Sequence, residues 1–162
     1  MPVIDVTPDL DALTLTITAE FAAPRDRVWD VYADPRKLEA IWGPPGYPAT
    51  FVEHSLVPGS RCTYYMTGPE GERFGGWWLI TAVDAPSSFA FDDGFADADL
   101  NPAADMPVSK NVYTFTERDG VTRAVFVSAY ADAAGLQQVL EMGMVEGASA
   151  AINQIDALLA AA

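Results

Sequence analysis

The chain has 162 residues, half of them hydrophobic, which is enough for one domain with its own core and excludes a disordered protein. The formal net charge is −14, from 23 acidic and 9 basic residues, so we expect neither nucleic acid nor an anionic membrane surface as a partner. A single cysteine, Cys62, fits a reducing compartment, and the N-terminal segment lacks the basic and apolar regions of a signal peptide. We therefore predict a cytoplasmic protein without membrane insertion.

The N-terminal part is predicted to contain one strand followed by two short helices. Residues 1–12 are expected to be a lead-in to the domain. From residue 13 to 21 apolar and polar side chains alternate without interruption, which predicts a half-buried strand. Pro24 suits the first turn of a helix, and a second helix is predicted to begin at Pro35 and to end at Trp42, before a glycine- and proline-rich run.

The middle of the chain is predicted to form antiparallel strands, because apolar and β-branched residues recur between turn-forming segments. The expected strands cover residues 49–57, 61–67, 74–83, 89–92, 108–116 and 122–130. Residues 92–107 have no periodicity and are predicted to be a long loop. Gly75 and Gly76 lie within an expected strand and indicate a β-bulge there.

Residues 132–159 are predicted to form one long amphipathic helix around which the strands are arranged. Its apolar stripe consists of Leu136, Leu140, Met144, Gly147, Ala151, Ile155 and Leu158. Gly143 and Gly147 lie on or beside this stripe, although glycine costs about 1 kcal/mol relative to alanine in a helix interior. They indicate either a close approach of another backbone or space left for a ligand.

Between residues 21 and 44 the chain carries an ordered set of residues, Phe21, Pro24, Val28, Trp29, Asp34, Pro35, Leu38, Trp42, Gly43 and Pro44. Their order and spacing resemble the opening signature of the START-like superfamily, also called SRPBCC or birch-pollen-allergen-like. More narrowly, the chain resembles the branch named after the activator of the ninety-kilodalton heat-shock protein's ATPase. The resemblance covers nearly the whole chain and implies a single START-like domain over residues 13–162. Departures at Ile41, Ser60, Cys62 and Met144 mean that no ligand is carried over from a relative.

The resemblance implies an α+β helix-grip fold. In this fold a curved antiparallel β-sheet is wrapped around a long C-terminal helix, with two short helices between strands 1 and 2. A mainly apolar cavity lies between the sheet and the C-terminal helix. The strands and the long helix predicted from periodicity are consistent with this architecture.

Strand alternation predicts which side chains face that cavity, if the polar residues of each strand face solvent. Glu53 facing outward would place His54 inside, for example. Trp77 and Trp78 are adjacent in a strand that is apolar on both faces, so the inward one of the two is left open. The predicted cavity residues are Trp42, His54, Tyr64, Met66, Phe91, Tyr113, Phe115, Phe126 and Met144, with Cys62, Ala124, Ser128 and Tyr130 also facing inward. A plain packed core is the alternative interpretation of these residues.

The acid/base groups near the predicted cavity are His54, Tyr64, Tyr113, Tyr130 and the carboxylates of Asp92 and Asp93. His54 is the first candidate for a general base because histidine titrates near neutral pH, and a structural histidine is the alternative. Cys62 is predicted to be a small buried hydrophobe rather than a nucleophile. One histidine and one cysteine do not form a conventional zinc site, and we predict no metal and no other cofactor.

The sequence leaves three functions open. The first is a carrier or sensor that binds a small hydrophobic molecule, such as a lipid, in the cavity without catalysis. The second is an enzyme of the polyketide cyclase or hydrolase type, which the superfamily resemblance implies. The third is a co-chaperone that acts through its surface. A tryptophan exposed on the 74–83 strand would offer a face for a homodimer.

Overall fold

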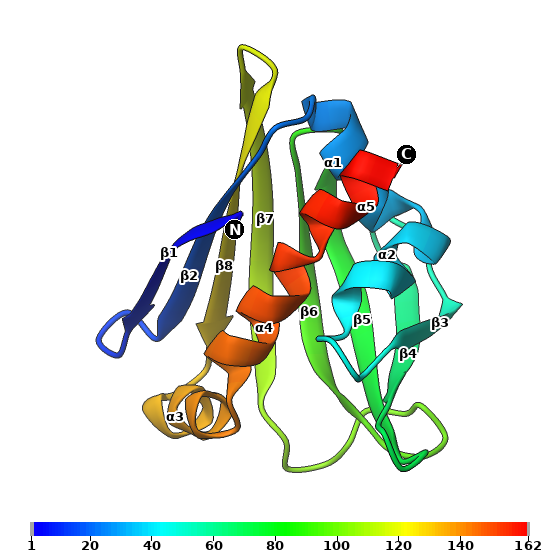
Figure 1. Cartoon of the computed structure of the whole chain (residues 1–162). Helices are drawn as coiled ribbons and strands as arrows, with labels where there is room; N and C mark the ends of the chain where they lie inside the picture. Colours follow the sequence, from blue (N-terminus) through cyan, green and yellow to red (C-terminus); the bar gives the residue numbers. More distant parts are fainter. Residues whose placement is uncertain (1, 162) are drawn as a thin grey trace.

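One curved eight-stranded sheet is the framework of the molecule, as the computed structural model shows for residues 2–161 (Figure 1). The strand order is β1-β2-β8-β7-β6-β5-β4-β3, and every neighbouring pair is antiparallel. The strands are β1 (Val3–Asp9), β2 (Thr14–Phe21), β3 (Ala49–Glu53), β4 (Arg61–Thr67), β5 (Arg73–Asp84), β6 (Ser88–Ala96), β7 (Val108–Arg118) and β8 (Val121–Tyr130).

The helices pack on the concave side of this sheet. They are α1 (Arg25–Ala33), α2 (Pro35–Trp42), α3 (Ala133–Glu141), α4 (Met144–Asn153) and α5 (Ile155–Ala161). In Figure 1, α4 and α5 run diagonally across the sheet, α1 and α2 cover the end near α5, and α3 lies at the opposite end. This arrangement is the predicted α+β helix-grip fold. No helix within residues 2–161 is long and apolar enough to cross a membrane.

The two short helices form where the sequence predicts them. Pro24 is the N-cap of α1, and the Asp34 carboxylate accepts a hydrogen bond of 2.9 Å from the Arg36 backbone N–H at the start of α2. Each helix buries its apolar side, and Tyr32 of α1 is 1% exposed. These two helices therefore fill one half of the concave face and leave the other half to α4.

The C-terminal helix is present, but the prediction of one continuous helix over residues 132–159 is wrong. Gly143 adopts φ +82, a left-handed conformation that ends α3 and redirects the chain into α4. A second interruption occurs at Gln154, whose side-chain Nε2 donates a 2.8 Å hydrogen bond to the Gly43 carbonyl. The apolar stripe continues through both breaks, and for this reason periodicity alone does not reveal them.

The first residues are a strand rather than a lead-in. β1 pairs with β2 and forms one edge of the sheet. Pro8 is tolerated there because proline has no backbone N–H, and an edge strand has a partner strand on one side only. The Val3 backbone N–H donates a 3.0 Å hydrogen bond to the Asn153 side chain, which ties β1 to α4. Ile4 is 48% exposed, so this edge strand shows little of the alternation by which buried strands are recognised.

Three strand predictions in the middle of the chain also need correction. β3 ends at Glu53, and its register shifts after Phe51, which reverses the predicted alternation: Phe51 is buried and Val52 is exposed. β6 extends to Ala96, so the loop that follows is shorter than expected. Gly75 and Gly76 pair in regular register with β4, and the irregularity in β5 lies between Ile80 and Ala82 instead.

The adjacent tryptophans of β5 lie on opposite faces of the sheet. Trp78 is 0% exposed and belongs to the core, whereas Trp77 is 9% exposed and lies on the outer face. The Trp77 ring covers Gly94 on β6, and the Arg61 guanidinium lies 5.7 Å from its centroid. Neither tryptophan is exposed enough to form the expected dimer face, and a homodimer stays a prediction.

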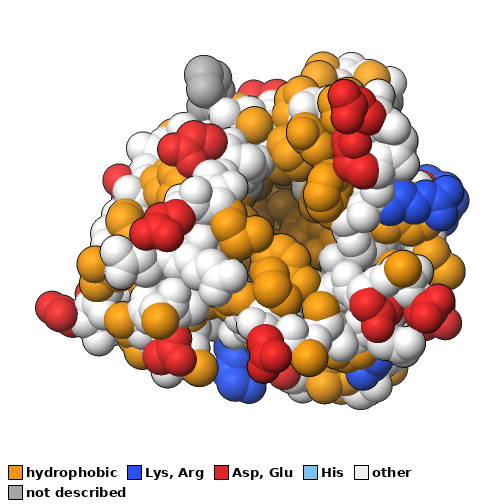
Figure 2. Space-filling view, turned by 90° about the horizontal axis from the view of Figure 1, so that it is seen from below, with side chains coloured by type: hydrophobic (Ala, Val, Ile, Leu, Met, Phe, Trp, Pro, Cys, Tyr) orange, Lys and Arg blue, Asp and Glu red, His pale blue; other side chains and the backbone are white. Residues whose placement is uncertain are grey.

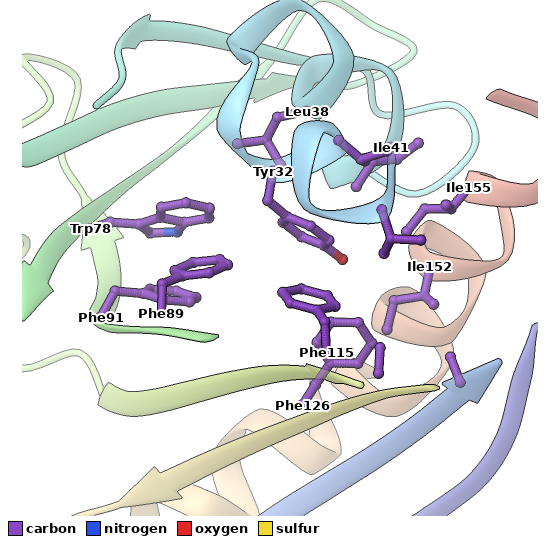
Figure 3. Packing of buried hydrophobic residues seen from close by; sticks show 14 of the residues in the cluster. Tyr32, Leu38, Ile41, Trp78, Phe89, Phe91, Phe115, Phe126, Ile152 and Ile155 are labelled. Atoms are coloured by element: carbon purple, nitrogen blue, oxygen red, sulfur yellow. The ribbon is translucent and has the colours of Figure 1, made fainter. Parts of the chain in front are cut away.

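The core beside α1 and α2 is built from stacked aromatic rings (Figure 3). The centroids of Trp78 and Phe91 are 4.3 Å apart, and those of Phe89 and Phe91 are 5.3 Å apart. Tyr32 lies between this stack and the isoleucines of α4 and α5, Ile152 and Ile155. This half of the interior is a close-packed core, which confines any cavity to the other half.

Candidate functional site

A cavity of about 430 Å³ lies between the sheet and α4. Its mouth is at the end of the molecule where α3 lies, and Figure 2 shows it as a deep hollow with mostly hydrophobic walls. Exposed apolar side chains from three separate segments, Tyr47, Phe74 and Met142, line its outer part. A surface groove of about 450 Å³ between α1 and α5 is lined partly by charged side chains, and only the interior cavity gathers buried titratable groups.

The cavity wall includes most of the residues predicted for it, namely Trp42, Tyr64, Met66, Tyr113, Phe126 and Met144. Ser128 and Tyr130 line it as well. Phe91 and Phe115 face inward but do not reach the cavity, because they are 1% and 0% exposed within the aromatic core. Whether the wall residues bind a ligand stays a prediction.

His54 does not line the cavity, which removes the first candidate for a general base there. Because β3 ends at Glu53 and carries a bulge, His54 leaves the sheet and packs against Phe51 and Trp78. Its Nε2 lies 2.8 Å from the Tyr32 carbonyl, which can only accept, so Nε2 carries the proton. Burial lowers the pKa of His54, and it is therefore a neutral structural residue.

The polar groups of the cavity form a hydrogen-bonded cluster around Asp93. The Tyr64 hydroxyl donates to Asp93 Oδ1 over 3.0 Å. Beside it, Asn111 Nδ2 donates to Ser109 Oγ over 3.0 Å, and Ser128 Oγ donates to Asn111 Oδ1 over 2.6 Å. Sequence reasoning missed Ser109 and Asn111, although the same alternation that places Tyr113 inside would have placed them there.

Tyr64 and Asp93 meet although β5 separates their strands. Tyr64 lies opposite Gly76 in the β4–β5 pairing, and a Cβ atom on Gly76 would lie 2.2 Å from Tyr64 Cζ. The ring therefore lies across the glycine and reaches β6, where Asp93 is found. The absence of a side chain at Gly76 gives the Tyr64 side chain its path to Asp93.

Burial dominates the electrostatics of this cluster. It raises the pKa of the Asp93 carboxyl from 3.8 to about 7, although the hydrogen bond from Tyr64 lowers that pKa. Burial and then the Asp93 charge raise the pKa of Tyr64 well above its ordinary value of 10. Among the described residues that line the cavity there is no Lys, Arg or His. Asp93 is thus a carboxyl without a cationic partner that changes charge near neutral pH.

Two other candidate side chains, Asp92 and Cys62, do not line the cavity. Asp92 points away from Asp93 and has Lys110 Nζ 3.5 Å from its Oδ1. Cys62 is 0% exposed, burial raises the pKa of its thiol, and Sγ donates to the Ser55 carbonyl over 3.7 Å. It is a buried residue of low reactivity, as predicted, rather than a nucleophile.

Replacing Gly76 with alanine is expected to displace Tyr64 and break its hydrogen bond to Asp93. The new Cβ would lie 2.2 Å from Tyr64 Cζ, and a packed ring cannot yield by that much without repacking. We expect a loss of about 1 to 3 kcal/mol in the free energy of unfolding, measured by urea denaturation. Gly75→Ala is the control, because its nearest contact would be 3.1 Å and its loss should be smaller. Equal losses in the two variants would contradict this account.

The fold and the cavity define a protein of the SRPBCC superfamily with a helix-grip architecture. Within it, the chain belongs to the family described as Activator of Hsp90 ATPase homolog 1-like protein, which matches residues 22–160. The superfamily and the family both agree with the resemblance found in the sequence.

Solved structures of similar proteins share this fold. A crystal structure of a protein from Mycobacterium smegmatis is 68% identical, with a TM-score of 0.91 over 98% of this chain and 97% of that chain. A solution structure of a protein from Arthrobacter aurescens is 42% identical, with a TM-score of 0.94 over 99% and 93% of the two chains. At 23% identity, an AHSA1 protein from Silicibacter pomeroyi has a TM-score of 0.73 over 91% of this chain and 97% of that chain. No curated protein matches the chain.

Proposed function

We propose that the protein binds a small hydrophobic molecule, as a carrier or sensor, in the cavity between the sheet and α4. The observation that carries this proposal is the cavity itself, about 430 Å³ with mostly apolar walls and a mouth at one end of the fold. This volume lies within the range of sites that enclose drug-sized molecules, roughly 300 to 1,000 Å³. Apolar walls with a few convergent polar groups are typical of such sites.

Gly147 provides the test, because the space beside it distinguishes a binding cavity from a packed core. It lies in α4 on the cavity wall, and apart from its two chain neighbours and the helix backbone no atom of residues 2–161 is within 4 Å of the position of an added Cβ. Its backbone is not left-handed, so a side chain causes no strain there. The glycine leaves room, which favours the second of the two interpretations considered for it from the sequence.

Gly147→Phe is expected to abolish binding of a neutral apolar dye such as Nile red, because the new ring extends into the cavity. The substitution should not destabilise the fold, since replacing glycine within a helix contributes up to about 1 kcal/mol. Fluorescence titration gives the affinity, and thermal denaturation confirms folding. Gly147→Ala is the matched control and should bind the dye as the unmodified protein does. Dye binding that is unaffected by Gly147→Phe, or absent in every variant, would overturn the proposal.

An enzyme that uses the same cavity is the second candidate. It is favoured by one observation, a carboxyl with a pKa of about 7 that lies 3.0 Å from a tyrosine hydroxyl inside an apolar cavity. A group of this pKa suits general acid/base catalysis at neutral pH. Incubation of the protein with small-molecule extracts tests it. A product that mass spectrometry detects with the unmodified protein but not with Asp93→Asn would support catalysis, and an unchanged extract would support binding alone.

Co-chaperone action and a cytoplasmic location are two further predictions. The family description names an activator of the Hsp90 ATPase, so co-chaperone action stays a third prediction, which a chaperone ATPase assay would test. A cytoplasmic location stays a prediction based on the single, buried cysteine.

A further inference from the structure

The charge distribution of the cavity restricts what kind of molecule it accepts. Asp93 is the one acidic residue among the described residues of the wall, and none of the others is Lys, Arg or His. Its Oδ1 accepts from Tyr64, and no hydrogen bond from residues 2–161 engages Oδ2. The Oδ2 atom of Asp93 can therefore accept a hydrogen bond from a bound ligand.

Anionic ligands are disfavoured at this position. A fatty acid or a phospholipid headgroup would bring a second negative charge next to Asp93, with no cationic side chain on the described wall to pair with either. Burying an unpaired charge is strongly unfavourable. The net charge of −14 also repels anions at a distance.

The aromatic surroundings of Asp93 suit a cation instead. Tyr64, Tyr113 and Tyr130 line the same part of the wall, and the Asp93 charge contributes, after burial, to raising the pKa of Tyr130 to about 12. Burial, then Tyr32 and then the Asp93 charge raise the pKa of Tyr113. Tyrosine rings attract ammonium groups through their negative faces, and a carboxylate next to them adds an ion pair. Proteins use this combination to bind amines.

We propose that the cavity selects hydrophobic amines, ligands with an apolar body and one protonated nitrogen that pairs with Asp93. The inference rests on the proposed function, because it names the ligand class of the same cavity. The apolar wall formed by Trp42, Phe126 and α4 holds the body, and the Asp93 carboxylate holds the nitrogen.

Binding of an amine is coupled to the protonation of Asp93. The titratable groups that line the cavity around Asp93 are Tyr64 of β4, Tyr113 of β7, Tyr130 of β8 and Tyr32 of α1, while β5 and α4 contribute none. Since burial raises the pKa of all four tyrosines, they stay neutral below about pH 9, and Asp93 alone changes charge. Affinity for an amine should therefore rise up to tenfold per pH unit from about pH 5 to pH 7, and level off above.

The test compares decylamine, decanol and decanoate by isothermal titration calorimetry at about pH 8, since the three share one apolar chain and differ in the polar group. We expect decylamine to bind at least about tenfold more tightly than the other two. Asp93→Asn should remove this advantage, so that decylamine binds no more tightly than decanol. Asp92→Asn, the same change on the outer face of the same strand, should leave the advantage in place, which excludes a mere effect of net charge. Gly147→Phe should abolish binding of all three, which excludes adsorption to the surface.

The outcomes separate this inference from the function on which it rests. Decanol binding as tightly as decylamine, decanoate binding most tightly, or a preference for the amine that survives in Asp93→Asn would overturn the ligand class while leaving a hydrophobic binding site. Failure of decanol, decylamine and Nile red alike to bind would overturn the binding function itself.

Discussion

Asp93→Asn is expected to stabilise the protein by roughly 2 to 4 kcal/mol at about pH 8. Burial raises the pKa of this carboxyl from 3.8 to about 7, so the folded protein holds an ionised group at pH 8 in a place that favours the neutral form. Each pKa unit corresponds to about 1.4 kcal/mol. Asparagine has nearly the same shape, carries no charge, and its Oδ1 can still accept the hydrogen bond from Tyr64.

The gain should depend on pH in a defined direction. Because the folded pKa lies above the unfolded one, the folded state of the unmodified protein binds more protons between about pH 4 and pH 7, and the Asp93 contribution to stability is lost as pH rises through that window. The difference between Asp93→Asn and the unmodified protein should vanish near pH 4 and reach its full size above about pH 7. Urea denaturation at a series of pH values measures it.

Asp92→Asn is the control for this pH dependence. Asp92 lies on the outer face, with Lys110 3.5 Å away, and its replacement should change stability by less than about 1 kcal/mol, as is usual for surface ion pairs. Asp93 is partly buried on the cavity wall, and a loss of stability in Asp93→Asn at pH 8, or a gain that is independent of pH, would show that its charge is not destabilised there.

The sequence predicted a strand best where one face of that strand is buried and the other is exposed to solvent. β2, β7 and β8 each have one buried and one solvated face, and there the alternation gave both the strand and the inward side chains correctly. β1 lies at the sheet edge with both faces largely exposed, so it carries little such contrast. In β3 a single extra residue after Phe51 reverses the alternation, and no pattern in the sequence marks it.

The sequence predicted which side chains of the candidate site face inward, but not which of them reach the cavity. Tyr113 and Phe115 were both expected to face inward, and both do, yet only Tyr113 reaches the cavity, because α1 places Tyr32 over Phe115. Which part of the concave face the helices cover depends on packing between distant segments. Asp93 was named among the acid/base groups, but its partner Tyr64 reaches it across Gly76 from two strands away.

Trp78→Ala is expected to destabilise the protein by about 3 to 5 kcal/mol, the range for removing a large aromatic side chain from a core. Trp78 is 0% exposed, and its ring packs at centroid distances of 4.3 Å on Phe91, 4.9 Å on Trp42 and 5.6 Å on Phe51. Removing it leaves a space bounded by rigid rings, which cannot collapse to fill it. Since domains of this kind are stable by only about 5 to 15 kcal/mol, the midpoint of urea denaturation should fall steeply.

Trp77→Ala is the matched control, because it removes the same side chain from the neighbouring position on the opposite face. The Trp77 ring covers the Gly94 backbone at the surface, and water can occupy the space that it leaves. We expect about half the loss of Trp78→Ala, since the transfer of apolar surface is lost but no closed cavity forms. An equal or larger loss in Trp77→Ala would mean that the outer face contributes as much to stability as the aromatic core. In that case the stack of Trp78, Phe89 and Phe91 would not be the structural support on which the cavity depends.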